Sequence, residues 1–246
     1  MGAPAGAWYF RGLAQAHHLL EDYEEELATA QRALGYYPNF LSMRQQEVRA
    51  LAALSKIGQM QRGIDESLTV RSQDGTPDDV MLEAAEEIVL HGHADAARET
   101  ADRAVEWLRN RPPQDQRPAD LARALFVAGR WQEARAEYEI LVAQYPENIE
   151  HIGHLGATLA RLGDAQAARR IAGELRSIDR PYLFGRPTYW QAAIAAILGD
   201  SEGAISLIRE WISQAFRVDY VLLHRDPNFE PLREYPPFQE ILRPKG

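Results

Sequence analysis

The chain has 246 residues, of which 46% are hydrophobic and 26% are charged, so it can form a folded core and is not a disordered tail. Its net charge of −9 argues against a surface that coats nucleic acid, and the absence of cysteine excludes disulfides, thiolate metal ligands and cysteine nucleophiles. Because the sequence has neither signal-peptide features nor an apolar run of the ~18 to 20 residues that span a bilayer, we expect a cytoplasmic protein without membrane or nucleic-acid partners.

A glycine recurs along the chain at nearly constant spacing. Gly58, Gly92, Gly129, Gly163 and Gly199 are separated by 34, 37, 34 and 36 residues. Each follows one apolar stretch of helical period and precedes another. Glycine in this place is expected to end the first helix of a pair, since it relieves the steric cost of a left-handed turn. Self-similarity at this period predicts a solenoid of helix pairs.

Six copies of this unit follow one another, so that residues 1–216 form one array. The copies cover residues 7–38, 44–72, 78–110, 115–146, 149–180 and 185–216, and the first has Glu21 in place of the glycine. A small residue is expected where the second helix crosses the first, and four copies have alanine there: Ala97, Ala134, Ala168 and Ala204. The second copy has Gly63 and the first has Glu26 at this place. These two units are therefore the least regular.

Three segments rich in proline, glycine and polar residues are predicted to be loops between copies: 71–77, 109–118 and 178–187. In the first loop, Thr76 followed by Pro77 and two aspartates predicts a capped helix N-terminus. The loop with Pro112 and Pro113 is expected to connect adjacent repeats, although a hinge between two halves of the array is the alternative.

The fourth copy has the clearest motif: Leu121, Ala122, Leu125, Gly129, Trp131, Ala134, Tyr138 and Pro146. This pattern resembles the tetratricopeptide repeat. The resemblance implies an all-α, right-handed superhelical solenoid of about six helix pairs, in which the first helix of each pair lines a concave groove. It further implies a protein-interaction scaffold that binds a protein or peptide partner, has no enzymatic activity and needs no cofactor.

Residues 217–246 have a different composition and are predicted to form a C-terminal capping segment. Prolines at 227, 231, 236 and 237 exclude a long helix, whereas the apolar side chains of the segment need burial, and the last repeat has an apolar face to cover. The segment also resembles the tail that closes tetratricopeptide arrays in large bacterial regulators. The matching residues are Asp226, Pro227, Phe229, Pro231, Leu232, Arg233, Pro236, Phe238, Gln239 and Leu242. In such regulators the array follows a serine/threonine kinase, a nucleotide cyclase or a winged-helix DNA-binding domain, which implies that this chain is the regulatory or sensory region of a longer signalling protein.

Two apparent chemical motifs are not expected to act as such. His224-Arg225-Asp226 matches the start of a protein-kinase catalytic loop, but Pro227 follows it and the other kinase motifs are missing. The histidine pairs at 17–18, 91–93 and 151–154 have no third ligand at a suitable spacing. We therefore predict no catalytic residues and no metal site.

The predicted binding surface is the groove along the first helices. Its candidate residues are Arg11, Gln15, His18, Gln45, Arg49, Ser55, Glu83, Glu86, Arg123, Phe126 and Tyr189. Because this set contains both charges and aromatic rings, it suits a peptide that carries charges of both signs and one apolar anchor. Two alternatives remain open from the sequence: a metal- or carboxylate-dependent enzyme built inside the superhelix, and self-association through the exposed face of the first repeat.

Overall fold

The structure is a computed structural model that describes residues 6–215, 223–224 and 226–243, and all regular elements in this part are helical. The chain divides between Pro112 and Pro113 into two compact units. The first unit contains α1 (Ala7–Leu19), α2 (Tyr23–Tyr36), α3 (Leu41–Ala53), α4 (Ile57–Ser67), α5 (Pro77–Leu90) and α6 (Ala94–Arg109). The second contains η1 (Pro113–Asp115), α7 (Pro118–Val127), α8 (Trp131–Gln144), α9 (Ile149–Arg161), α10 (Ala165–Arg176), α11 (Arg186–Ile197), α12 (Ser201–Gln214), η2 (Pro227–Leu232) and α14 (Pro236–Leu242).

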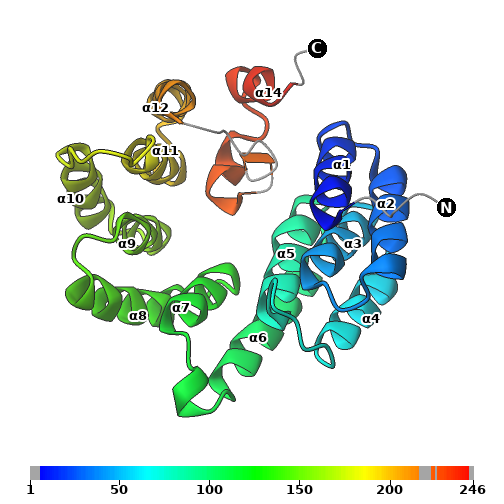
Figure 1. Cartoon of the computed structure of the whole chain (residues 1–246). Helices are drawn as coiled ribbons and strands as arrows, with labels where there is room; N and C mark the ends of the chain where they lie inside the picture. Colours follow the sequence, from blue (N-terminus) through cyan, green and yellow to red (C-terminus); the bar gives the residue numbers. More distant parts are fainter. Residues whose placement is uncertain (1–5, 216–222, 225, 244–246) are drawn as a thin grey trace. The chain divides into compact units, whose positions relative to one another are not determined.

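In the first unit, consecutive helices pack as antiparallel pairs that stack on one another. The pairs are α1 with α2, α3 with α4, and α5 with α6 (Figure 1). The central helix α3 contacts α2 on one side and α5 on the other. Each helix therefore packs mainly against its neighbours in sequence, as the repeat pattern predicts.

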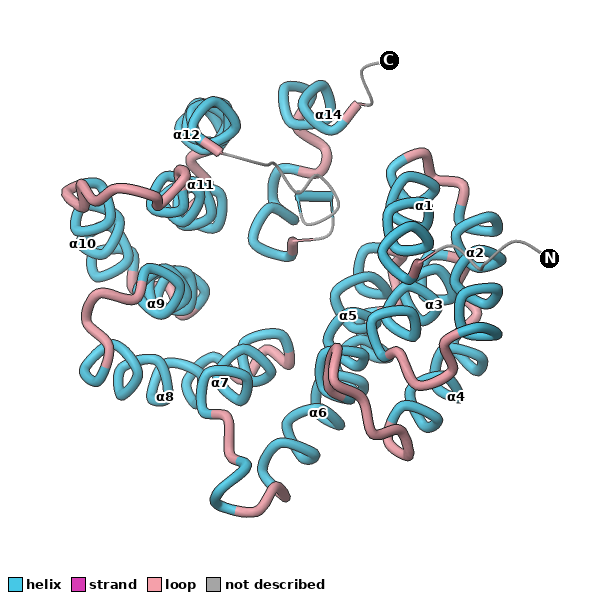
Figure 2. The backbone as a smooth tube through the Cα atoms, in the orientation of Figure 1, coloured by secondary structure: helices cyan, strands magenta, loops and turns pink. Residues whose placement is uncertain are grey.

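The second unit repeats this arrangement in α7 with α8, α9 with α10, and α11 with α12. The first helices α9 and α11 lie side by side, and η2 packs against α11 on the side away from α10 (Figure 2). Phe229, Leu232 and Phe238 of the tail are fully buried. The tail thus packs on an apolar face of the last pair, while the predicted boundary at 216/217 lies outside the described residues.

The turn inside each pair contains one residue in the left-handed conformation. Gly92, Gly129, Gly163 and Gly199 have φ between 73° and 84°, and Glu21 has φ 59° in the first pair, as the sequence alignment predicts. In the second pair this residue is Ser55, with φ 55°, whereas Gly58 lies in the first turn of α4. The assignment of Gly58 to the turn was therefore wrong, because serine accepts this conformation at a cost of roughly 1–2 kcal/mol.

This shift also changes the crossing residue of the second pair. Ala97, Ala134, Ala168 and Ala204 follow their turn glycines by five residues and are all buried. Counted from Ser55, the corresponding residue is Met60, which is buried too. Gly63 lies one turn later and still marks a close approach, because a Cβ added there would lie 3.1 Å from a methyl group of Val48 on α3.

The helix start predicted at Thr76 is present. The backbone amide of Thr76 donates a 3.1 Å hydrogen bond to Asp79, and the pair forms a capping box at the start of α5. The three predicted loops lie between α4 and α5, α6 and α7, and α10 and α11; the second of them contains η1. Within the described ranges, no helix is both long and apolar enough to cross a bilayer.

Candidate functional site

Three predicted groove residues of the first unit come together in a buried ion cluster. His18 Nδ1 lies 2.8 Å from Oε2 of Glu26, and Arg49 Nε donates a 2.7 Å hydrogen bond to Oε1 of the same carboxylate. Arg49 Nη1 also reaches Oε1 of Glu83 at 3.4 Å. The cluster therefore joins α1, α2, α3 and α5 through one arginine and its carboxylate partners.

Glu87 and His91 extend this cluster along α5. His18 Nε2 lies 3.6 Å from Oε2 of Glu87, and His91 Nε2 lies 2.9 Å from Oε1. Burial alone would raise the pKa of Glu87, but the hydrogen bond with His91 and the positive charge of Arg49 hold this pKa below its usual value. For nearby Tyr23, burial and the charge of Glu87 raise the pKa to about 12.

The expectation that His18 and Arg49 face an open groove is wrong. Arg49 is only 1% exposed and His18 only 5%, so they offer almost no surface to a partner. The physical reason is Glu26: its buried carboxylate takes the place of a small residue and needs hydrogen-bond partners, which Arg49 and His18 of the adjacent first helices supply. Glu26 was visible in the sequence as an irregularity, but its role depends on contacts across helices.

The other candidates of the first unit are dispersed. Arg11 is exposed, and Gln15 and Gln45 are half-buried, so these three keep accessible atoms on α1 and α3. Ser55 lies beyond the end of α3, where its hydroxyl is 3.0 Å from Nε2 of His93. Glu83 and Glu86 on α5 are buried.

In the second unit, Phe126 joins an aromatic cluster around His154. The ring of His154 stacks on Tyr138 with centroids 5.1 Å apart and planes at 4°, and Trp190 and Phe126 lie at 4.3 and 6.0 Å. Desolvation by burial, together with the charges of Arg123 and Arg186, lowers the pKa of His154 to about 3. The cluster therefore holds a neutral imidazole between α7, α8, α9 and α11.

An ion pair between two residues that were not among the predicted site residues joins the starts of α9 and α11. Arg186 Nε donates a 2.7 Å hydrogen bond to Glu150, and its second donor makes the contact bidentate. The guanidinium lies 4.6 Å from the ring centroid of Tyr189, and Trp190 Nε1 donates to Glu150 at 3.2 Å. The signal that could have found this pair is the repeat itself, since Glu150 and Arg186 are 36 residues apart, within the range of the repeat period.

Tyr189 is covered by the tail of the chain. Its hydroxyl donates to Asp226, and Phe229 packs edge-to-face on its ring at 5.7 Å. Arg161 Nη2 on α9 donates a 2.5 Å hydrogen bond to the carbonyl oxygen of Pro227. Asp226 also accepts from the amide of Asn228 at 2.8 Å and so begins η2. This aspartate, part of the kinase-like motif in the sequence, thus has a structural role, while Arg225 lies outside the described residues.

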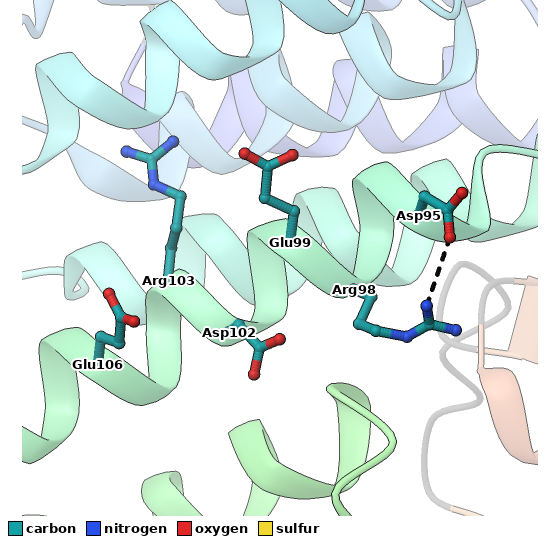
Figure 3. A pocket seen from close by; sticks show the side chains of 6 residues that line it. All are labelled: Asp95, Arg98, Glu99, Asp102, Arg103 and Glu106. Atoms are coloured by element: carbon teal, nitrogen blue, oxygen red, sulfur yellow. Dashed lines mark hydrogen bonds and ion pairs between the residues drawn. The ribbon is translucent and has the colours of Figure 1, made fainter.

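A shallow hollow of about 510 Å³ lies on α6, away from the predicted groove residues. Its lining residues are Asp95, Arg98, Glu99, Asp102, Arg103 and Glu106. Figure 3 shows Glu99 and Arg103 leaving α6 on one side and Asp102 and Arg98 on the other, with Arg98 paired to Asp95. Arg103 also pairs with Asp65 on α4. The hollow is therefore a solvated face with charges of both signs.

Among the residues that the structure describes, no three histidine, aspartate or glutamate side chains are arranged to hold a metal ion. Members of all three histidine pairs have other contacts: His18 is in the ion cluster, His91 is bonded to Glu87, and His154 is in the aromatic cluster.

Comparison with known proteins adds one finding. No protein-family model matches the sequence, and no curated protein matches it. A solved tetratricopeptide repeat protein from Parabacteroides merdae ATCC 43184 is similar in structure, with a TM-score of 0.50 over 90% of this chain and 82% of that one. The fold is of the tetratricopeptide-repeat type. At 10% sequence identity, the likeness shows the fold alone.

Proposed function

We propose that this chain is a protein-interaction scaffold that binds a peptide or protein segment along the first helices of its repeats. The tetratricopeptide-type fold supports the general function, because such arrays present extended surfaces. The observation that carries the proposal is the packing of the chain's own tail on α9 and α11. There, a short segment without long helices is bound by a tyrosine hydroxyl, an arginine and a ring contact.

The chemical groups in this contact indicate which kind of partner segment the neighbouring surface on α7 and α9 binds. The tail contributes one carboxylate, one backbone carbonyl and one phenylalanine ring. Arg123 on α7 is a half-buried cation in the same unit, and Phe126 lies one turn further along that helix. A partner segment that presents a carboxylate to Arg123 fits this surface, whereas buried Phe126 offers no contact to an apolar anchor.

The experiment is affinity capture from a lysate of the source cells with the wild-type chain and the Arg123→Glu variant. Phe126 is unsuitable as a test position, because it is only 5% exposed and packs against His154, so its truncation would disturb the fold. Arg135→Glu is the matched control, since Arg135 is an exposed arginine on α8 that pairs within its own helix. We expect Arg123→Glu to lose proteins that the wild type and the control retain. Equal retention by all three folded chains would contradict the proposed surface.

We also propose that the array is the regulatory region of a longer bacterial signalling protein in the cytoplasm. The support is the tail: Asp226, Phe229, Leu232 and Phe238, which match the tails of such regulators, are all buried here. The linked domain would be a kinase, a nucleotide cyclase or a DNA-binding domain on the N-terminal side. Sequencing the coding region upstream of Met1 tests this, and a stop codon in frame directly before Met1 would contradict it.

A further inference from the structure

One row of exposed residues on α1 is apolar, although Arg11 beside it is exposed too. Phe10, Ala14 and His18 of this helix are buried in the first unit. On the opposite side of the helix lies a row of residues spaced four apart. The row consists of Trp8, Gly12, Ala16 and Leu20, all exposed, with Trp8 80% and Leu20 65% accessible. A Cβ added to Gly12 would meet no atom of the described residues within 4 Å.

An apolar row on both sides is typical of a helix that packs on both sides. The solvent-facing side of a helix is normally polar. The neighbouring helix α2 follows that rule, because Glu24, Glu25 and Arg32 are among its exposed residues. Within this pair, α1 therefore has the more apolar exposed side.

We propose that α1 is a self-association surface on which the α1 helix of a second copy of this chain packs antiparallel. The row has large residues at its two ends and small ones in the middle. The order of large and small residues is therefore the same whether the helix is followed from its N-terminus or from its C-terminus. A two-fold axis between Gly12 and Ala16 places Gly12 of one copy opposite Ala16 of the other, and Trp8 opposite Leu20. On each α1, residues four apart form a ridge. When the ridge of one copy packs into the groove beside the ridge of the other, the two rows lie alongside each other.

Charge selects the antiparallel arrangement over the parallel one. The first turn of α1 has no acidic residue, and its N-cap is Gly6, which has no side chain to bind the free amides. Exposed Glu21 and Asp22 follow the other end of the helix. In the antiparallel pair, these carboxylates lie beside the positive N-terminal end of the second α1. In a parallel pair, the carboxylates of both copies would lie together and repel.

Trp8 is already held in place for such a contact. Its ring packs at 6.4 Å on Tyr9, which packs at 5.8 Å on Phe10, which in turn stacks at 6.0 Å on Tyr36 of α2. The indole also lies over Gly6, where a Cβ would come within 2.8 Å of its Nε1. Because a braced aromatic side chain loses little freedom on binding, Trp8 is suited to anchor the interface.

The first test is the mass of the full chain in solution, measured by sedimentation equilibrium over a range of concentrations. We expect the wild-type mass to rise with concentration from 27.8 kDa towards twice that value. Ala16→Arg places a charge at the centre of the row and should weaken self-association at least tenfold, as should Trp8→Ala. Ala136→Arg, the same change at an exposed alanine of α8, should behave as the wild type. A wild-type chain that stays monomeric throughout, or folded Ala16→Arg and Trp8→Ala variants that associate as the wild type does, would overturn the proposal.

The second test exploits the absence of cysteine in the chain. Gly12→Cys and Ala16→Cys chains are mixed in equal amounts under mild oxidation. The antiparallel pair predicts that the mixed disulfide between the two variants exceeds both homodimeric disulfides. A predominant Ala16→Cys homodimer would instead indicate parallel packing and would overturn the arrangement proposed here.

Discussion

Glu26 and Arg49 pair in the interior of the first unit, at a place where four other repeats have alanine. Arg49 Nε donates to Glu26 at 2.7 Å, and a second guanidinium nitrogen bonds the same carboxylate oxygen. Both side chains are buried, so neither charge is solvated by bulk water. A buried pair of this kind contributes little net stability but is costly to break, because the remaining charge has no equivalent partner.

Replacing Glu26 with the alanine of the other repeats is therefore expected to destabilise the protein. Glu26→Ala should lower the free energy of unfolding by about 3–5 kcal/mol, since Arg49 and His18 lose their shared carboxylate. Urea unfolding followed by circular dichroism measures this. Glu25→Ala, an exposed neighbour on α2, should change stability by less than about 0.5 kcal/mol. A cost for Glu26→Ala no larger than that of the control would show that the ion cluster does not hold the unit together.

The Arg49→Met change provides a second step to this experiment. In the double variant with Glu26→Ala, both charges of the pair are gone. The double variant should lose less stability than the sum of the two single variants, because each single change leaves one charge of the pair buried. Additive losses would mean that the other partners of Arg49, Gln46 and Glu83, rather than Glu26, determine its energetics.

The repeat architecture could be predicted from the sequence because it depends on local patterns. Helical period, small crossing residues and turn glycines predicted a solenoid of helix pairs, and the described part of the chain is all helical and packs in this way. The exception has a local cause: Gly58 is only three residues from Ser55, and a glycine is a stronger sequence signal for a turn than the serine that actually adopts positive φ.

The exposure of the candidate groove residues could not be predicted from these local patterns. Arg49 and Tyr189 occupy first-helix positions, as predicted, but one is enclosed by Glu26 and the other by the tail. Both partners come from elsewhere in the chain, 23 and 37 residues away. Periodicity places a side chain on a face of a helix, whereas burial depends on what packs against that face.

Gly153 and Trp190 form a close contact between α9 and α11 that should not tolerate a methyl group. A Cβ on Gly153 would lie 2.1 Å from the indole ring of Trp190, which is itself only 2% exposed. Gly153→Ala should therefore cost about 1–3 kcal/mol through overpacking, despite the better helix propensity of alanine. Thermal unfolding measures the loss, and the near-ultraviolet circular dichroism of the tryptophan should change with it.

Gly173 on α10 is the matched control for this prediction. It is also a glycine inside a helix, but no atom of the described residues lies within 4 Å of its added Cβ. Gly173→Ala should stabilise the protein by about 0.5–1 kcal/mol. If the two variants shifted the melting temperature in the same direction, the close contact between α9 and α11 would be in doubt.

The hydroxyl of Tyr189 should fasten the tail to the last repeat. Tyr189→Phe keeps the ring contacts with Phe229 but removes the donor to buried Asp226. We expect a loss of about 1–3 kcal/mol, because the carboxylate loses a hydrogen bond away from water. Hydrogen exchange should become faster in η2 and α14 but not in α7 and α8. Tyr182→Phe is the control, since Tyr182 is 84% exposed, and it should leave both stability and exchange unchanged.

His154 should make the second unit sensitive to acid. Burial, with Arg123 and Arg186 nearby, lowers the pKa of His154 to about 3, whereas an unfolded histidine has a pKa near ~6.5. Between these values the unfolded chain binds a proton that the folded chain does not, so stability increases with pH in this window. The contribution is fully present above about pH 6.5 and is lost as the pH falls towards 3.

Removing this titrating group should therefore shift acid unfolding to lower pH. His154→Phe keeps an aromatic ring between Tyr138 and Trp190, and the Nδ1 atom that it removes has no hydrogen-bond partner among the described residues. We expect the variant to be at least as stable as the wild type at neutral pH and to unfold at lower pH. Direct titration of the imidazole by NMR is the independent measurement: protonation of His154 near pH 6 in the folded protein would mean that the ring is solvated and that the aromatic cluster is open to water.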